Sequence, residues 1–297
     1  MASSKPSWLK KKHSAPGNYI FTRHLLKDLN INTVCDEAHC PNRNDCFGDK
    51  NATFLLLGKY CTRNCLFCSI EHDMSKLHID ELEPQRIALA VQRMQLKYVV
   101  LTSVTRDDLE DGGAGMFIRT VEEIRKLMND IKIEVLIPDF NGNLKPLQDI
   151  LDIKPAILNH NIEMIKELYP IYRPYSSYFR SLELLSNANS ISEIPVKTGF
   201  MVGLGESKEQ IESLLEDIHE CGVDILTIGQ YIAPTSFHAR PVRYYHPAEF
   251  DELKQIANDS GIRHVLSGPF VRSSFKAYDT YMNLNKSDME MLEKEKQ

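Results

Sequence analysis

The chain has 297 residues, of which 42% are hydrophobic and 26% are charged, and its net charge is −6. This composition excludes a disordered chain, and charges interrupt every apolar run before the roughly 18 residues that a membrane span needs. The negative charge argues against a general nucleic-acid-binding protein, which is usually basic. The length fits one large domain, as in α/β barrels, or two small ones, and a chain this long can bury a core that needs no disulfides.

The first twelve residues are basic. They contain Lys5, Lys10, Lys11 and Lys12 and no acidic residue. Because no apolar segment follows these lysines, we expect no secretory signal and a cytoplasmic protein. Two interpretations of the segment stay open: a solvated terminus, or an arm that folds over a site or contacts an acidic partner.

Six of the seven cysteines lie between positions 35 and 68. They form two triplets, namely Cys35, Cys40 and Cys46 in CDEAHCPNRNDC and Cys61, Cys65 and Cys68 in CTRNCLFC. In a chain of this size such a cluster indicates metal or redox chemistry rather than a disulfide framework. The seventh, Cys221, is expected to be a small buried apolar residue.

Each triplet has three cysteines, one fewer than the four ligands of a structural zinc site or of a four-iron ferredoxin site. Structural zinc takes four nitrogen or sulfur ligands, and a four-iron ferredoxin site normally takes four cysteines. A triplet alone therefore suggests a four-iron cluster with one iron open to a substrate or cofactor. Zinc knuckles and an electron-transfer ferredoxin are the alternatives, although a ferredoxin would leave most of this chain without a role.

From residue 51, short apolar strands alternate with helical patterns. Strands are predicted at 51–60, 97–104, 132–139, 156–162, 196–204, 223–232 and 264–270. Helices are predicted from Pro84, a residue suited to a first helical turn, and at 115–129, 143–152, 180–189, 207–221 and 247–260. Six or seven such repeats favour a parallel sheet in a partial or full (β/α) barrel over a doubly wound sheet.

The barrel prediction places the two triplets. In (β/α) barrels the chemistry lies on loops that follow the strands, and the second triplet directly follows the first strand. The first triplet precedes the barrel and must fold back over its top. The predicted units are an N-terminal extension at 1–50, a barrel at 51–270 and a C-terminal segment at 271–297.

The spacing C-x3-C-x2-C after the first strand of a (β/α) barrel resembles the signature of the radical S-adenosylmethionine enzymes. With the upstream triplet and further motifs, the chain resembles the lipoyl synthase family from about residue 30 to residue 280. These motifs are LTSVTRDDLEDGGAG (101–115), LNHNIE (158–163), RSLELL (180–185), KTGFMVGLGES (197–207), TIGQY (227–231) and GPFVRSS (268–274). The chain departs from the family pattern at Phe47, Met116, Phe275 and the stretch 233–237.

The resemblance implies two [4Fe–4S] clusters. Cys61, Cys65 and Cys68 would hold the cluster that binds S-adenosylmethionine and generates a radical. Cys35, Cys40 and Cys46 would hold an auxiliary cluster, whose fourth ligand is carried to Ser274, with Ser273 as the alternative. The family uses this auxiliary cluster as its sulfur donor, so it is consumed unless it is rebuilt.

The implied reaction inserts two sulfur atoms at C6 and C8 of an octanoyl chain attached to a lysine of a lipoyl carrier domain. The implied partners are octanoylated 2-oxoacid dehydrogenase E2 subunits and glycine cleavage H protein, an electron donor and a cluster-repair protein, with no nucleic acid and no membrane. Two alternatives are another radical sulfur-inserting enzyme, acting on a small molecule or an RNA base, and a non-catalytic iron–sulfur sensor or scaffold.

Other residues are candidates for S-adenosylmethionine contacts. Phe67 is where the superfamily places an aromatic ring near the adenine. The remaining candidates lie within or after the predicted strands: Thr105, with Arg106, Asp107 and Asp108 beside it, Asn159, Glu163, Arg173, Arg180, Gly203 and Gly205. For each of them the alternative is a packing role, a solvated charge or a hydrogen bond that shapes a loop.

Overall fold

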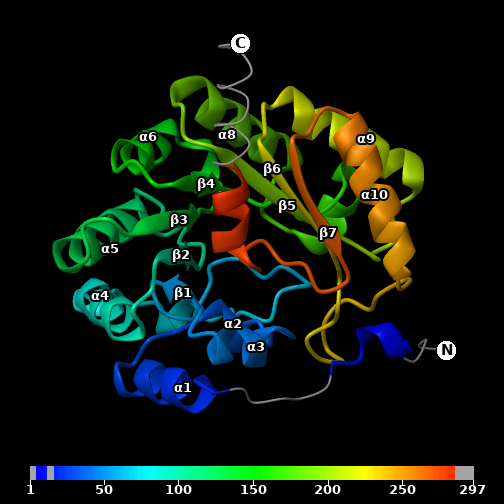
Figure 1. Cartoon of the computed structure of the whole chain (residues 1–297). Coiled ribbons are helices and arrows are strands. Elements are labelled where there is room, and N and C mark those ends of the chain that lie inside the picture. Colours follow the sequence, from blue (N-terminus) through cyan, green and yellow to red (C-terminus); the bar gives the residue numbers. More distant parts are fainter. Residues whose placement is uncertain (1–4, 12–16, 285–297) are drawn as a thin grey trace, which may run out of the picture.

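Seven parallel strands follow one another around a partial barrel in a computed structural model that describes residues 5–11 and 17–284 (Figure 1). The strands are β1 (Thr53–Leu56), β2 (Tyr98–Ser103), β3 (Lys132–Leu136), β4 (Ile157–Asn159), β5 (Val196–Val202), β6 (Ile225–Gln230) and β7 (His264–Gly268). Each pairs in parallel with the next, and β1 and β7 end the sheet. The predicted partial (β/α) barrel is confirmed, and every strand lies within a predicted range.

Six helices cover the outer face of the strands, as right-handed βαβ crossovers require (Figure 1). They are α4 (Glu83–Met94), α5 (Ala114–Leu127), α6 (Leu144–Asp152), α8 (Tyr178–Ile191), α9 (Lys208–Glu220) and α10 (Pro247–Asp259). Local sequence sets their starts: Ser207 and Gln210 form a capping box on α9, and Pro84 stands in the first turn of α4. The main apolar core lies between these helices and the strands.

Shorter elements surround the end of the barrel where the strands finish. The helices are α1 (Tyr19–Asp28), α2 (Val34–Glu37), α3 (Arg43–Gly48) and α7 (Tyr169–Tyr172), and the 3₁₀ turns are η1 (Ser7–Leu9), η2 (Met74–Lys76), η3 (Phe140–Gly142) and η4 (Lys166–Leu168). The helices α1 to α3 lie beside the β1 edge, where Leu55 N–H donates to the Asn32 carbonyl at 3.0 Å (Figure 1). The sequence patterns did not predict α1, α2 or α3.

A helical segment, residues 277–284, lies inside the ring of strands (Figure 1). It packs on the early residues of alternate strands and forms an apolar cluster separate from the main core. The members are Ala277, Leu284, Tyr98, Val100, Ile157 and Ile225. The segment thus fills the part of the barrel interior where the strands begin and leaves the other end open.

A buried ion pair, Lys197 with Glu134, lies in the barrel interior next to this apolar cluster. Lys197 and Glu134 are 1% and 0% exposed, and Lys197 Nζ lies 2.9 and 3.2 Å from the two Glu134 oxygens. Tyr98 OH and Asn159 Nδ2 also donate to Glu134, at 2.8 and 3.0 Å. The ion pair is therefore satisfied from both neighbouring strands, as a buried charge must be.

His160, directly after β4, is a second buried polar residue. Its Nδ1 donates to the Ile137 carbonyl at 2.9 Å, so Nε2 accepts from the Ser181 hydroxyl at 3.0 Å. This pairing describes a neutral imidazole. Burial lowers the pKa of His160 to about 4.

Among the residues described, no helix combines the length and apolar composition that a bilayer crossing requires.

The Lys197–Glu134 pair gives a stability prediction. Lys197→Met should lower the free energy of unfolding by about 3–5 kcal/mol, because it leaves the Glu134 carboxylate buried without a cation. Adding Glu134→Gln should recover most of the loss, since the amide removes that charge. Urea unfolding of both variants checks this, and equal stability of the single and double variants would contradict it.

His160 gives a pH prediction. The unfolded chain protonates this ring near pH 6.5, whereas the folded chain resists protonation until about pH 4. Stability from His160 is therefore complete above pH 6.5 and declines as pH falls towards 4, by about 3 kcal/mol in total. Unfolding of the metal-free protein at several pH values, with His160→Gln as the reference, measures it. A wild type that loses no more stability than His160→Gln would disprove the assignment.

Candidate active site

A cavity of about 710 Å³ opens at the end of the barrel where the strands finish. It contains residues from both cysteine triplets and from the segment after β7. Those predicted from the sequence are Cys35, Cys40, Cys46, Phe67, Cys68, Glu163, Ser273 and Ser274. The fold therefore brings into one cavity residues that are more than 200 positions apart.

The first triplet lies on α2, α3 and the turn between them. Thr33 begins α2 by accepting a hydrogen bond from Asp36 N–H, and Cys35 is buried on this short helix. Burial raises the pKa of Cys46 to about 12 and raises that of Cys35 further, and the neighbouring Cys40 adds to both shifts. These thiols are thus close enough that each thiolate would disfavour ionisation of its neighbours. Bound iron would offset the free-energy cost of forming several thiolates together.

The second triplet occupies the loop after β1. Cys68 N–H donates to the Cys65 carbonyl at 3.0 Å, and Cys61 N–H donates to Glu71 at 2.8 Å. Burial raises the pKa of Cys68 to about 12, with further contributions from Cys65 and Cys61. Within the described ranges, no three Cys, His, Asp or Glu side chains converge on one ion; a four-iron cluster needs a wider arrangement, since each thiolate binds a different iron.

Glu163 and Arg272 are half-buried charged residues that line the cavity. Burial raises the pKa of Glu163, while Arg173 and Asn161 oppose the shift. Glu163 in turn raises the pKa of Cys65 and Cys68, whereas Arg272 interacts with Cys40 as well as with Glu163. A carboxylate and a guanidinium therefore lie between the two triplets.

The backbone at Glu163 is held in an unusual conformation. Its φ of 69° lies in the left-handed region, which is costly for a residue other than glycine. Two hydrogen bonds to β5 hold it there: Glu163 N–H donates to Gly199 at 2.9 Å, and Met201 N–H donates to Glu163 at 2.8 Å. This conformation, together with the position of Glu163 in the cavity lining, supports a functional role for Glu163.

The other predicted cofactor contacts lie outside the cavity lining. Arg173 is adjacent, because its charge acts on Cys65 and Glu163, and its Nε is buried without a partner among the described residues. The Thr105 carbonyl accepts two hydrogen bonds from Thr62. Asn159 binds Glu134 in the barrel interior, and Arg180 binds Asp139 at 3.2 Å.

Gly203 and Gly205 form a turn after β5 with φ values of 107° and 116°. A Cβ on Gly203 would lie 2.1 Å from Gln230 Nε2 and 2.7 Å from the Arg243 carbonyl. Gly203 N–H donates to the Glu206 carboxylate at 2.6 Å. The structure thus accounts for this turn by backbone packing, and cofactor contact by these glycines stays a prediction.

The N-terminal arm crosses the cavity. Lys5, Lys10 and Lys11 line it, and Lys11 Nζ lies 2.6 Å from both Asn42 Oδ1 and Asp45 Oδ2 next to the first triplet. Trp8 Nε1 donates to the Tyr245 carbonyl at 3.2 Å. Of the two interpretations of this segment, the structure favours the arm that folds over a site. Lys12 and residues 285–297 lie outside the described residues.

All four departures from the family pattern can be located. Phe47 is buried beside the first triplet, where its carbonyl accepts from the Thr22 hydroxyl, and Met116 is buried on α5. Phe275 lines the cavity, 5.9 Å from Lys11 Nζ. In the stretch 233–237, Ala233 and Pro234 also line the cavity. Phe275 and this stretch therefore bear directly on the shape of the site, whereas Phe47 and Met116 do not line it.

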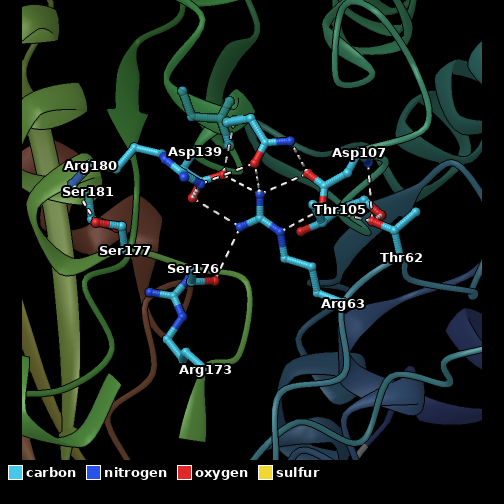
Figure 2. A network of polar contacts seen from close by, with 12 residues as sticks. Thr62, Arg63, Thr105, Asp107, Asp139, Arg173, Ser176, Ser177, Arg180 and Ser181 are labelled. Atoms are coloured by element: carbon cyan, nitrogen blue, oxygen red, sulfur yellow. Dashed lines mark hydrogen bonds and ion pairs between the residues drawn. The ribbon is translucent and has the colours of Figure 1, made fainter. Parts of the chain in front are cut away.

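Sequence reasoning missed Arg63, which lies within the second triplet and binds two aspartates, Asp107 and Asp139 (Figure 2). Burial opposes ionisation of Asp139, but its bonds to Arg63 lower its pKa to about 2. Arg272 and Asn42 were missed as well. The available signal was their position, since each lies within or directly beside a segment that carries predicted ligands.

Comparisons with known proteins identify the family of this chain. A model described as the radical SAM superfamily matches residues 55–218. Proteins described as lipoyl synthase are similar: that of Chlorobium limicola is 46% identical over 92% of this chain and 94% of its own, and that of Desulfotalea psychrophila is 47% identical over 93% of each. A third, from Caldicellulosiruptor saccharolyticus, is 46% identical over 94% of this chain and 98% of its own.

Solved structures support the fold. The crystal structure of methylornithine synthase (PylB) superposes with a TM-score of 0.53 at 14% identity, over 82% of this chain and 81% of its own. That of HydG, a maturase of the [FeFe]-hydrogenase, has a TM-score of 0.57 at 12% identity, over 83% of this chain and 54% of its own. At these identities the likeness concerns the barrel alone.

Proposed function

This chain belongs to the lipoyl synthase family of radical S-adenosylmethionine enzymes, and on that premise we propose how its two cysteine triplets divide the work. The family's reaction inserts sulfur into an octanoyl group on a lipoyl carrier domain. The observation that carries our proposal is the single cavity lined by the whole first triplet, by Cys68 of the second triplet and by both candidate serines. A substrate carbon held in this cavity would lie between the first triplet and the loop that carries the second.

Cys61, Cys65 and Cys68 hold one [4Fe–4S] cluster together with S-adenosylmethionine, and Cys35, Cys40, Cys46 and Ser274 hold a second. When bound, the first group supplies a 5′-deoxyadenosyl radical and the second supplies the sulfur atoms. Buried thiols suit this role because iron stabilises the thiolates that burial disfavours. Unactivated C–H bonds have no acidic proton, so the reaction needs no catalytic base.

The chain's own residues bind the substrate and exclude water. Apolar side chains line the cavity and suit an octanoyl chain; they include Val34, Leu136, Met201, Ile232 and Phe270. Phe67 adjoins the second triplet in the same lining, in keeping with a contact to the adenine. Arg173, with its buried unpaired Nε, is the candidate that binds the S-adenosylmethionine carboxylate.

Ser274 is favoured over Ser273 as the fourth ligand. The Ser273 hydroxyl already donates to Asn161 Oδ1 at 2.6 Å. In the part of the chain that the structure describes, the Ser274 hydroxyl has no such bond, and it lines the same cavity. An oxygen ligand binds iron more weakly than a thiolate, which suits a cluster that releases its sulfur.

The proposal extends to partners. Substrates are octanoylated E2 subunits and glycine cleavage H protein. An electron donor must reduce the first cluster and a repair protein must rebuild the second, because sulfur insertion consumes it. We place this chemistry in the cytoplasm. The net charge of −6 supports the absence of a nucleic-acid partner.

The division of work predicts opposite phenotypes for single cysteine variants. Cys61→Ala should abolish formation of 5′-deoxyadenosine. Cys40→Ala should retain cofactor cleavage and yield no sulfur-containing product. The assay is mass spectrometry of an octanoyl-lysine carrier peptide after anaerobic incubation with reductant and S-adenosylmethionine.

The matched control is Cys221→Ala, because Cys221 is buried away from both triplets beside the Leu182 carbonyl. Reconstituted wild type and this control should contain about eight irons, four for each cluster. About four irons, bound zinc, or thiolated product from both triplet variants would show that the two-cluster assignment is wrong.

The serine assignment has its own test. Ser274→Ala should retain 5′-deoxyadenosine formation and lose thiolated product, whereas Ser273→Ala should change product yield little. The same peptide assay measures both variants. The reverse pattern would transfer the ligand role to Ser273, and loss of product in neither variant would exclude a serine ligand.

A further inference from the structure

Arg63 has an unusually complete set of partners. It lies between Cys61 and Cys65, and its side chain is 4% exposed. The guanidinium lies outside the cavity lining and extends between the loops that follow β2 and β3 (Figure 2). The loop that carries the second triplet therefore has a charged anchor outside the cavity lining.

The guanidinium binds two carboxylates, each through two bonds. Nε and Nη2 donate to the Asp107 oxygens at 2.7 and 2.8 Å, and Nη1 and Nη2 donate to the Asp139 oxygens at 3.0 and 2.6 Å. Ser176 Oγ and Asn141 Oδ1 accept further bonds at 3.2 and 2.9 Å. A planar fork of five N–H groups suits this pattern, and a lysine ammonium cannot reproduce it.

The surrounding bonds connect this anchor to three strand ends. Thr62 N–H donates to the Thr105 carbonyl after β2 at 3.0 Å, and Asp139 follows β3. Leu66 N–H donates to the Tyr172 carbonyl in α7 at 2.9 Å, so the far side of the loop is attached after β4. The loop from 61 to 66 contains no regular secondary structure, so these contacts hold its shape.

The anchor also reaches a predicted iron ligand directly. The backbone N–H of Arg63 lies 3.4 Å from Cys61 Sγ and donates to it. Hydrogen bonds to cysteine sulfur stabilise the thiolate and raise the potential of an attached cluster. A displaced Arg63 backbone would therefore change the electronic properties of the cluster as well as its position.

We infer that Arg63 is a positioning residue: its double carboxylate fork fixes the second triplet relative to β2 and β3 and keeps its N–H bond on Cys61. The inference rests on the proposal that Cys61, Cys65 and Cys68 hold a cluster. Asp107 and Asp139 are positioning residues as well, because they hold the Arg63 guanidinium in place.

The test is Arg63→Lys in the reconstituted enzyme. The rate of 5′-deoxyadenosine formation should fall on the order of 100-fold, the effect expected for a small displacement of reacting groups. The midpoint potential of the cluster held by the second triplet should fall, and its electron paramagnetic resonance signal should change, because the N–H bond to Cys61 is weakened. Asp139→Asn, which keeps the shape and removes one charge, should give an intermediate effect.

The matched control is Arg86→Lys. Arg86 binds one aspartate, Asp80, through two bonds, but it lies on α4 and is partly exposed. The rate of 5′-deoxyadenosine formation in this variant should therefore stay within about twofold of the wild-type rate. Cys61→Ala in the same experiment separates the ligand assignment of the second triplet from the positioning role of Arg63. If Cys61→Ala retains the cluster, the proposed ligands are wrong. If Cys61→Ala loses it while Arg63→Lys keeps the wild-type rate, potential and signal, the positioning role is overturned.

Discussion

A thiolate buried away from water is unstable unless positive charge stands beside it, and this barrel buries thiols of both triplets at its open end. The pKa values of Cys35, Cys46 and Cys68 are raised mainly by burial. Nearby cations such as Lys11 and Arg173 offset only part of this effect. These thiols are therefore costly to ionise without a bound cation, which is in keeping with the iron that we propose for both triplets.

The barrel interior is filled at one end and contains the cavity at the other. Residues 277–284 fill the end where the strands begin, and the Lys197–Glu134 pair lies above them. The remaining space is open only where the strands finish, which is where loops from different strands meet. Ser273 and Ser274 immediately precede the segment that fills the interior, so the same stretch of chain closes the barrel and supplies the candidate fourth ligand.

The sequence predicted the barrel well because its strands are short apolar runs separated by amphipathic helices with clear starts, such as Pro84 and Ser207. The cysteine spacing is informative without any fold, and the ligand role that it indicates stays a prediction. Sequence reasoning failed for α1 to α3: α2 and α3 are too short to show a helical period, and α1 packs on α3 and α4, contacts that no local pattern reveals. Arg63 was missed because its partners, Asp107 and Asp139, lie 44 and 76 positions away. The division at residues 50 and 270 stays a prediction.

The two loops are held in different ways, and the difference matches their proposed roles. The second triplet is anchored by a buried ion pair, in which Arg63 is 4% and Asp139 is 1% exposed. The first is held by a neutral bond from Asn42 to the Phe270 carbonyl at 2.7 Å and by the Lys11–Asp45 pair, which is 26% and 47% exposed. Exposed pairs contribute little, whereas breaking a buried pair is costly. A cluster that must survive many electron transfers benefits from the rigid anchor. A cluster that is consumed and rebuilt needs a loop, and an arm above it, that can open at small cost.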